Sequence, residues 1–141
     1  MSGIGKYRLV ALDSNIFIYH FEDNQEFKPP VDLIFKGLAE ATTRAVTSVI
    51  SVIEALSYPM PDVVVEEIEE AFKNIPNLQI LDVDHEIARE AAKIRRKYGA
   101  LRLPDAVQLA SASFARAQVF ITNDRRLKKF KKLSAILLSE I

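Results

Sequence analysis

The chain has 141 residues with 19 basic and 19 acidic side chains, so its formal net charge is zero. Its length fits one compact domain, residues 1–141, and its 49% of hydrophobic residues can supply a core. The absence of cysteine excludes disulfides and thiolate metal sites. No apolar run reaches the roughly 18 residues of a membrane span, and MSGIGKYRLV lacks the apolar segment of a signal peptide. We therefore expect a soluble, cytoplasmic protein without membrane association.

The first half of the chain alternates between short apolar segments and helical patterns. Residues 7–12 (YRLVAL) predict a buried strand, and a short helix is expected over residues 14–20. The next helix begins near Pro29, because proline suits the first turn of a helix. Residues 44–47 predict a second strand, after which Ser48 is placed to cap a helix over SVISVIEALSY.

The second half continues this alternation. The predicted elements are a helix after Asp62, a strand over residues 78–83, a helix capped by Asp84, a helix starting at Pro104 with Phe114 facing inward, a strand over residues 118–121, a short basic helix, and a strand over residues 135–138. Alternating strands and helices predict a parallel sheet joined by right-handed crossovers. The expected fold class is therefore α/β, a three-layer sandwich with a central parallel sheet flanked by helices.

Four acidic residues stand near one edge of this predicted sheet. Asp13 and Asp124 follow strands directly, whereas Glu54 and Asp105 lie on helices near the same edge. Ligands of open α/β sheets bind beyond the carboxyl ends of the strands, so these distant acids are expected to converge. Neighbouring anions repel one another unless a hard divalent cation lies between them, and oxygen ligands favour Mg²⁺ or Mn²⁺ over zinc. The pattern thus predicts a metal-dependent enzyme.

Each acid also has an ordinary structural interpretation. Asp13 and Asp124 could cap the helices that follow them, and Asp105 would suit the positive end of a helix dipole. Glu54 is the only charged residue of SVISVIEALSY, which is hydrophobic nearly all round and is therefore expected to be buried. A buried glutamate needs a partner, and the residues leave open whether this is a metal ion or a salt bridge with arginine or lysine.

Several polar side chains accompany the acids. Asn15, Ser48 and Thr122 stand at or just after predicted strand ends and are expected to support the site or contact its substrate. Arg125 and Arg126 directly follow the last acid and are candidates for contacts with a phosphate backbone. They open the basic run RRLKKFKK, whose ordinary interpretation is a solvated helix face. Since the net charge is zero, nucleic-acid binding does not follow from the total charge.

In their order and spacing, these segments resemble the PIN domain family, especially its small VapC-like toxin ribonucleases. The resemblance spans nearly the whole chain and rests on Asp13-Ser14-Asn15, the Ser48…Glu54 helix, Leu103-Pro104-Asp105-Ala106 and Thr122-Asn123-Asp124. It implies that the four acids form a negatively charged pocket that binds Mg²⁺ or Mn²⁺ and cleaves RNA. It also implies an antitoxin protein as partner and a homodimer.

The resulting hypothesis is a metal-dependent endoribonuclease in which Asp13, Asp105, Asp124 and Glu54 hold the metal. The cation would activate a water molecule and stabilise charge on the phosphoryl oxygens. One alternative is a PIN-like scaffold that binds RNA or protein without catalysis. Another is a phosphatase resembling the haloacid dehalogenases, which would have a second aspartate at the position of Asn15.

Overall fold

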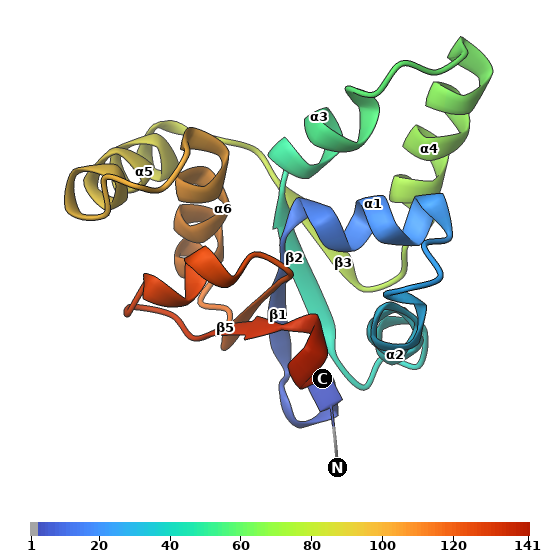
Figure 1. The fold of residues 1–141 in the computed structure, drawn as a ribbon, viewed down its shortest axis with the longest axis horizontal. Helices are drawn as coiled ribbons and strands as arrows, with labels where there is room; N and C mark the ends of the chain where they lie inside the picture. The colour runs from blue at the N-terminus through green and yellow to red at the C-terminus, as the bar shows by residue number, and fades with distance from the viewer. Residues whose placement is uncertain (1–2) are drawn as a thin grey trace.

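A five-stranded, wholly parallel sheet forms the centre of the computed structural model, which describes residues 3–141 (Figure 1). The strands are β1 (Leu9–Leu12), β2 (Arg44–Ser48), β3 (Leu78–Leu81), β4 (Val119–Thr122) and β5 (Ala135–Leu137). They are arranged in the order β3-β2-β1-β4-β5, and every neighbouring pair is parallel. The predicted α/β sandwich is therefore confirmed.

Helices cover both faces of the sheet (Figure 1). The α-helices are α1 (Ser14–Glu22), α2 (Lys28–Ala39), α3 (Ile50–Leu56), α4 (Asp62–Asn74), α5 (His85–Lys97) and α6 (Leu103–Phe114). Three short 3₁₀ helices are η1 (Gly3–Lys6), η2 (Arg125–Lys129) and η3 (Leu138–Glu140). Helices α1 to α4 pack on one face, and α5, α6 and η2 pack on the other. None of the helices within residues 3–141 is long and apolar enough to cross a membrane.

Both faces of the central strands are buried. Successive side chains of a strand point to opposite faces, so Val10 and Leu12 pack in the core beside α1 and α2, whereas Ala11 packs in the core beside α5 and α6. In β4, Phe120 likewise lies on the opposite face from its neighbours. Strands buried on both faces are continuous apolar runs, which is why β1 and β4 can be recognised in the sequence.

The connections place β1 between two halves of the sheet. After β1 the chain builds β2 and β3 on one side, and it then returns through α5 and α6 to build β4 and β5 on the other. In such doubly wound sheets, ligands bind where the strand order reverses, at the carboxyl ends of the strands. Here this point lies between β1 and β4, where Asp13 and Thr122 stand.

The N-cap residues predicted at Asp13 and Asp84 are confirmed, whereas the one predicted at Ser48 is wrong. The side chain of Asp13 accepts a hydrogen bond from the backbone N–H of Ser14, and that of Asp84 accepts one at the start of α5. Ser48, in contrast, is the last residue of β2, and Val49 occupies the N-cap position of α3. The Ser48 hydroxyl still accepts a hydrogen bond from the backbone of α3. The chain therefore turns one residue later than predicted.

Two burial predictions are wrong. Phe114, expected to face inward, is 53% exposed, because it is the last residue of α6. Helix α3, expected to be buried nearly all round, exposes 56% of Ile53. Only Ser51 and Ala55 of this two-turn helix are buried, since it lies beyond the end of β2 and packs along one side. Glu54 is accordingly half-buried.

The contrast between Phe17 and Phe114 can be tested directly. Phe17 is fully buried, with its ring centre 5.1 Å from that of Phe72 and 6.1 Å from that of Phe35. Phe17→Ala should lower the free energy of unfolding by about 3–5 kcal/mol, because it leaves a cavity in the core. Phe114→Ala is the matched control, with an expected loss below about 1 kcal/mol at its exposed site. Urea denaturation measures both, and equal losses would contradict this packing.

Candidate functional site

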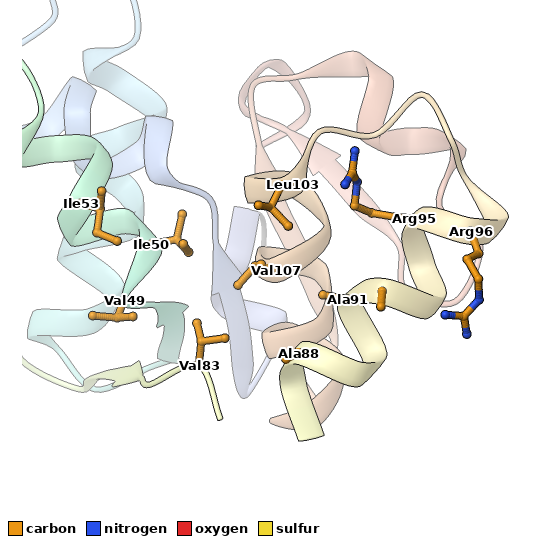
Figure 2. A pocket seen from close by; sticks show the side chains of 11 residues that line it. Val49, Ile50, Ile53, Val83, Ala88, Ala91, Arg95, Arg96, Leu103 and Val107 are labelled. Atoms are coloured by element: carbon orange, nitrogen blue, oxygen red, sulfur yellow. The ribbon is translucent and has the colours of Figure 1, made fainter. Parts of the chain in front are cut away.

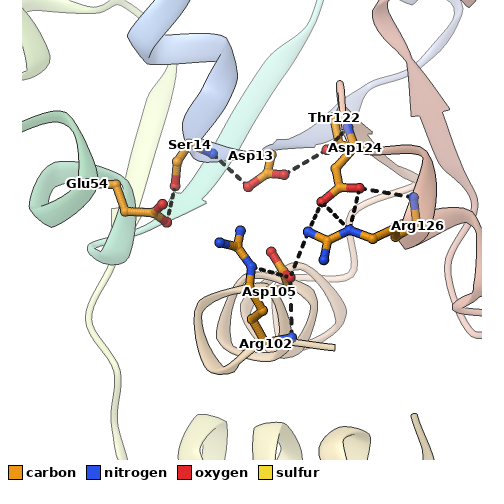
Figure 3. Close-up of polar contacts among 8 residues, drawn as sticks. All are labelled: Asp13, Ser14, Glu54, Arg102, Asp105, Thr122, Asp124 and Arg126. Atoms are coloured by element: carbon orange, nitrogen blue, oxygen red, sulfur yellow. Dashed lines mark hydrogen bonds and ion pairs between the residues drawn. The ribbon is translucent and has the colours of Figure 1, made fainter. Parts of the chain in front are cut away.

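Asp13 lies at the centre of the candidate site, at the end of β1. Its carboxylate is buried, and each oxygen has one hydrogen-bond donor (Figure 3). The backbone N–H of Ser14 donates to Oδ1 at 2.8 Å, and the Thr122 hydroxyl donates to Oδ2 at 2.7 Å. The cap of α1 and the end of β4 thus fix the orientation of this carboxylate.

Thr122 joins the two strand ends. Its hydroxyl oxygen donates to Asp13 and accepts a hydrogen bond from the backbone N–H of Asp124 at 3.0 Å. The following residue, Asn123, donates from its side chain to the Tyr19 hydroxyl at 2.9 Å. The loop after β4 is therefore held against both Asp13 and α1.

The other two aspartates are paired with arginines. Asp124 accepts hydrogen bonds from the Arg126 guanidinium, with Nε at 3.0 and 3.1 Å from its two oxygens. Asp105, buried in the first turn of α6, accepts a hydrogen bond from Nε of Arg102 at 3.3 Å. Nη2 of Arg126 also lies 3.9 Å from Oδ2 of Asp105, so its guanidinium lies between the two aspartates (Figure 3). The Arg126 hydrogen bond lowers the pKa of Asp124, against the opposing effect of burial.

Glu54 approaches the site from α3. One of its oxygens accepts a hydrogen bond from the Ser14 hydroxyl at 2.8 Å (Figure 3). No salt bridge links it to an arginine or lysine in the part of the chain that the structure describes. Of the two partners that the sequence left open for Glu54, the salt bridge is therefore not formed.

The acids meet at one edge of the sheet, but their side chains do not form a coordination shell. Within residues 3–141, no three His, Cys, Asp or Glu side chains are grouped closely enough to hold a metal ion. Two arginines lie among the four carboxylates instead, which leaves an excess of two negative charges when all four acids are ionised.

Other residues singled out in the sequence lie at different distances from the acids. The Ser48 side chain is buried and contacts the backbone of α3. Asn15 lies in the first turn of α1, and its Oδ1 atom is buried without a hydrogen-bond partner among the residues described. Arg125 is exposed and forms no salt bridge within residues 3–141, unlike Arg126. Of the two arginines, Arg126 is thus the one placed at the acids.

A buried polar network beneath the acids was missed in the sequence. It consists of Ser14, Thr47, Ser51 and Gln108, linked by hydrogen bonds of 2.7 to 3.0 Å. Gln108 has a detectable signal, since it is the one long polar side chain within the otherwise small and apolar stretch AVQLASASF of α6. The serines and the threonine have none, because short hydroxyl side chains are common at helix starts and strand ends.

Burial raises the pKa of Asp13 from 3.8 to about 6. The hydrogen bonds from Thr122 and Ser14 act against this shift, while the charges of Asp105 and Glu54 add to it. The ionised form of Asp13 is therefore poorly stabilised by the protein alone. Because all the candidate donors are carboxylate oxygens and the excess charge is negative, the chemistry of this set fits a hard divalent cation.

An apolar groove of about 830 Å³ lies between α3, α5 and α6 (Figure 2). Its walls include Ile50 and Ile53 from α3 and Leu103 and Val107 from α6. Ile53 directly precedes Glu54, and Leu103 lies two residues before Asp105, so the same two helices carry acids of the site. The groove thus adjoins the candidate site.

The raised pKa of Asp13 predicts how stability depends on pH without metal. The folded protein holds the Asp13 proton more tightly than the unfolded protein does. The stability that this proton contributes is therefore complete below pH 3.8 and is lost as the pH rises through about 6. The difference between the two pKa values corresponds to about 3 kcal/mol, an order-of-magnitude figure. Asp13→Asn cannot ionise at this position, so its stability should not fall over this pH range. At pH 7 its free energy of unfolding should exceed that of the wild type by about 1–3 kcal/mol.

Urea denaturation in EDTA at several pH values between 4 and 8 measures this difference. Asp62→Asn, at an exposed position, is the matched control and should keep the pH dependence of the wild type. Parallel pH dependences for wild type and Asp13→Asn would show that Asp13 is not the responsible group.

The model of the PIN domain family matches residues 10–133 of the chain. No curated protein matches the chain. Among solved structures, a toxin-antitoxin complex from Klebsiella pneumoniae contains a chain that is 21% identical, with a TM-score of 0.71 over 94% of this chain and 99% of that chain. DNA-bound VapBC from Salmonella typhimurium gives 20% identity and a TM-score of 0.70, over 93% of this chain and 98% of that chain. VapBC2 from Rickettsia felis, bound to a promoter DNA fragment, gives 16% identity and a TM-score of 0.69, over 92% of this chain and 98% of that chain.

At these identities the solved structures show a shared fold. The family match is independent of them and covers all four acids, from the second residue of β1 to the segment after η2. The parallel sheet flanked by helices agrees with that match. The chain therefore belongs to the PIN domain family.

Proposed function

We propose that this protein is a VapC-like endoribonuclease that cleaves RNA phosphodiester bonds with Mg²⁺ or Mn²⁺. The observation that supports this most strongly is the buried Asp13 carboxylate, held in a fixed orientation at the point where the sheet reverses its strand order. Burial and the neighbouring acids raise the pKa of Asp13 to about 6. A bound cation would stabilise the ionised carboxylate and lower this pKa again. A carboxylate kept under such unfavourable conditions suits function better than stability.

Each residue of the site has a defined task in this proposal. Asp13, Asp105, Asp124 and Glu54 would hold the cation. When bound, the metal supplies a water molecule of lowered pKa and offsets charge on the phosphoryl oxygens. Thr122 and the backbone of Ser14 keep Asp13 oriented, so that its oxygens need not reorganise for the reaction.

Arg126 has two successive roles in the proposal. Without metal, its guanidinium neutralises Asp124 and part of the charge of Asp105. A divalent cation bound by these carboxylates would compete with the guanidinium for the same oxygens. The Arg126 side chain is half-exposed even when paired, so after release it would be accessible to a phosphate of the RNA backbone.

We further propose that an antitoxin-like protein binds this chain and that the chain forms a homodimer. The similar solved structure from Klebsiella pneumoniae is a toxin-antitoxin complex. This chain exposes apolar side chains along the groove beside the acids, including Ile53 and Leu103. Such a surface is typical of sites that bind another protein.

A scaffold that binds RNA or protein without catalysis is the second candidate. The observation in its favour is the pairing of two of the four acids with Arg102 and Arg126. In a scaffold these ion pairs would be permanent, whereas in the proposed enzyme they would give way to the metal.

RNA cleavage tests the proposed enzyme. The wild type should cleave single-stranded RNA with Mg²⁺ or Mn²⁺ and lose this activity in EDTA. Asp105→Asn should lower the rate by more than about 100-fold, since loss of residues that only support a metal site already costs about 10- to 100-fold. Asp62→Asn, an exposed change of the same kind, should cleave like the wild type. Cleavage that persists in EDTA and in Asp105→Asn would refute a metal-dependent reaction.

Binding of Mn²⁺ without RNA tests the competition with Arg126. Arg126→Gln removes the guanidinium from Asp124 and Asp105, so Mn²⁺ should bind more tightly, by about two- to tenfold for a partly exposed pair. Arg125→Gln is the matched control, because it makes the same change at the neighbouring arginine, which forms no salt bridge within residues 3–141. Titration calorimetry measures both affinities. Unchanged or weaker binding in Arg126→Gln would favour the scaffold.

A further inference from the structure

Gln108 is a fully buried amide at the base of the candidate site. It lies on α6, one turn after Asp105, and only 2% of its surface is exposed. A buried amide is costly unless its donors and acceptor find partners. All three find one here, because Oε1 accepts a hydrogen bond from the backbone N–H of Ser48, and Nε2 donates to the hydroxyls of Ser14 and Ser51.

The contact with Ser48 fixes which way the amide points. The Ser48 N–H can only donate, so the oxygen of Gln108 must face it, at an N–O distance of 3.3 Å. The nitrogen then faces Ser14 at 3.0 Å and Ser51 at 2.8 Å. Since an amide nitrogen cannot accept a hydrogen bond, both serine hydroxyls must accept from it and direct their own hydrogens elsewhere.

These hydrogens have defined acceptors. Ser51 donates to the hydroxyl oxygen of Thr47, 2.7 Å away, because the Thr47 hydrogen is already donated to the backbone carbonyl of Leu12. Ser14 donates to Oε1 of Glu54 at 2.8 Å. The amide thus turns the hydrogens of Ser14 and Ser51 away from itself, whereas the Leu12 carbonyl takes that of Thr47.

Glu54 depends on this network for its position. The Ser14 hydroxyl is its one hydrogen-bond partner among residues 3–141, and no cation pairs with it there. The backbone N–H of the same serine also holds Asp13. Ser14 therefore links two of the four acids, and Gln108 decides where its hydroxyl points.

We propose that Gln108 is a positioning residue of the active site, which aims the Ser14 hydroxyl at Glu54 and thereby holds that carboxylate in place for the reaction. Gln108 touches neither substrate nor metal, so its effect passes through Glu54. This inference rests on the proposed metal-dependent cleavage for its catalytic consequence, whereas the hydrogen-bond chain itself can be tested in the metal-free protein.

The test uses Gln108→Met, which keeps the length and approximate volume of the side chain and removes its donors and acceptor. The matched control is Ser111→Ala, a buried polar change on the same helix, where the hydroxyl bonds back to the carbonyl of Val107 within α6. Ser14→Ala is a second variant, which removes the hydroxyl at Glu54 directly and leaves Gln108 in place.

NMR of the metal-free protein tests the hydrogen-bond chain. The Ser14 hydroxyl hydrogen, buried and bonded to Glu54, should exchange slowly with water in the wild type and in Ser111→Ala. In Gln108→Met its signal should be lost through fast exchange. A signal that remains unchanged in Gln108→Met would overturn the inference whether or not the protein cleaves RNA.

Steady-state cleavage of RNA tests the catalytic consequence. Gln108→Met should lower kcat by about 10- to 100-fold, as for residues that support a metal site, and leave KM unchanged. Ser14→Ala should behave alike, and Ser111→Ala should match the wild type. In a Glu54→Gln background, Gln108→Met should lower kcat no further, because both changes act through one carboxylate.

The outcomes separate the inference from the proposed function. A wild type without metal-dependent cleavage would refute the proposed function, and the NMR result alone would then decide the role of Gln108. A wild type that cleaves RNA, with a Gln108→Met variant that loses equal activity with and without Glu54, would refute the positioning role and leave the proposed function standing.

Discussion

The hydrogen bond between Thr122 and Asp13 is the contact on which the candidate site depends. It joins the end of β4 to the end of β1, two strands that become neighbours only because the chain returns through α5 and α6. The carboxylate that it orients is buried, so its charge is destabilising in the metal-free protein. The sheet thus places an ionisable group where folding alone would not favour one.

The surroundings of Asp13 reduce this electrostatic cost without removing it. Arg102 and Arg126 neutralise Asp105 and Asp124, whereas within residues 3–141 Asp13 and Glu54 receive only neutral donors. A site fully compensated by arginines would attract no further cation, and one without them would repel itself more strongly. The remaining negative charge is consistent with a site that binds a divalent cation in exchange for part of its ion pairs.

Beneath the acids, a buried polar network connects the core to the site through hydrogen bonds. Ser14, Ser51, Thr47 and Gln108 are buried, and each makes hydrogen bonds within the network. Satisfied buried networks fix side-chain geometry, because any rearrangement leaves a donor or acceptor unpaired. The two hydrophobic cores, one on each face of the sheet, hold the helices and strands that carry these residues.

The sequence by itself determined the alternation of strands and helices, the caps at Asp13 and Asp84, and the positions of four acids at strand ends and on helices near one edge of the sheet. These features depend on patterns within a few residues, such as apolar runs and side chains that bond to their own backbone. The tertiary structure decided the exposure of Phe114, the contact of Arg126 with Asp105 and the hydrogen bonds of Gln108. Those depend on contacts between segments as far apart as Ser14 and Gln108, 94 positions along the chain, whose meeting no local pattern encodes.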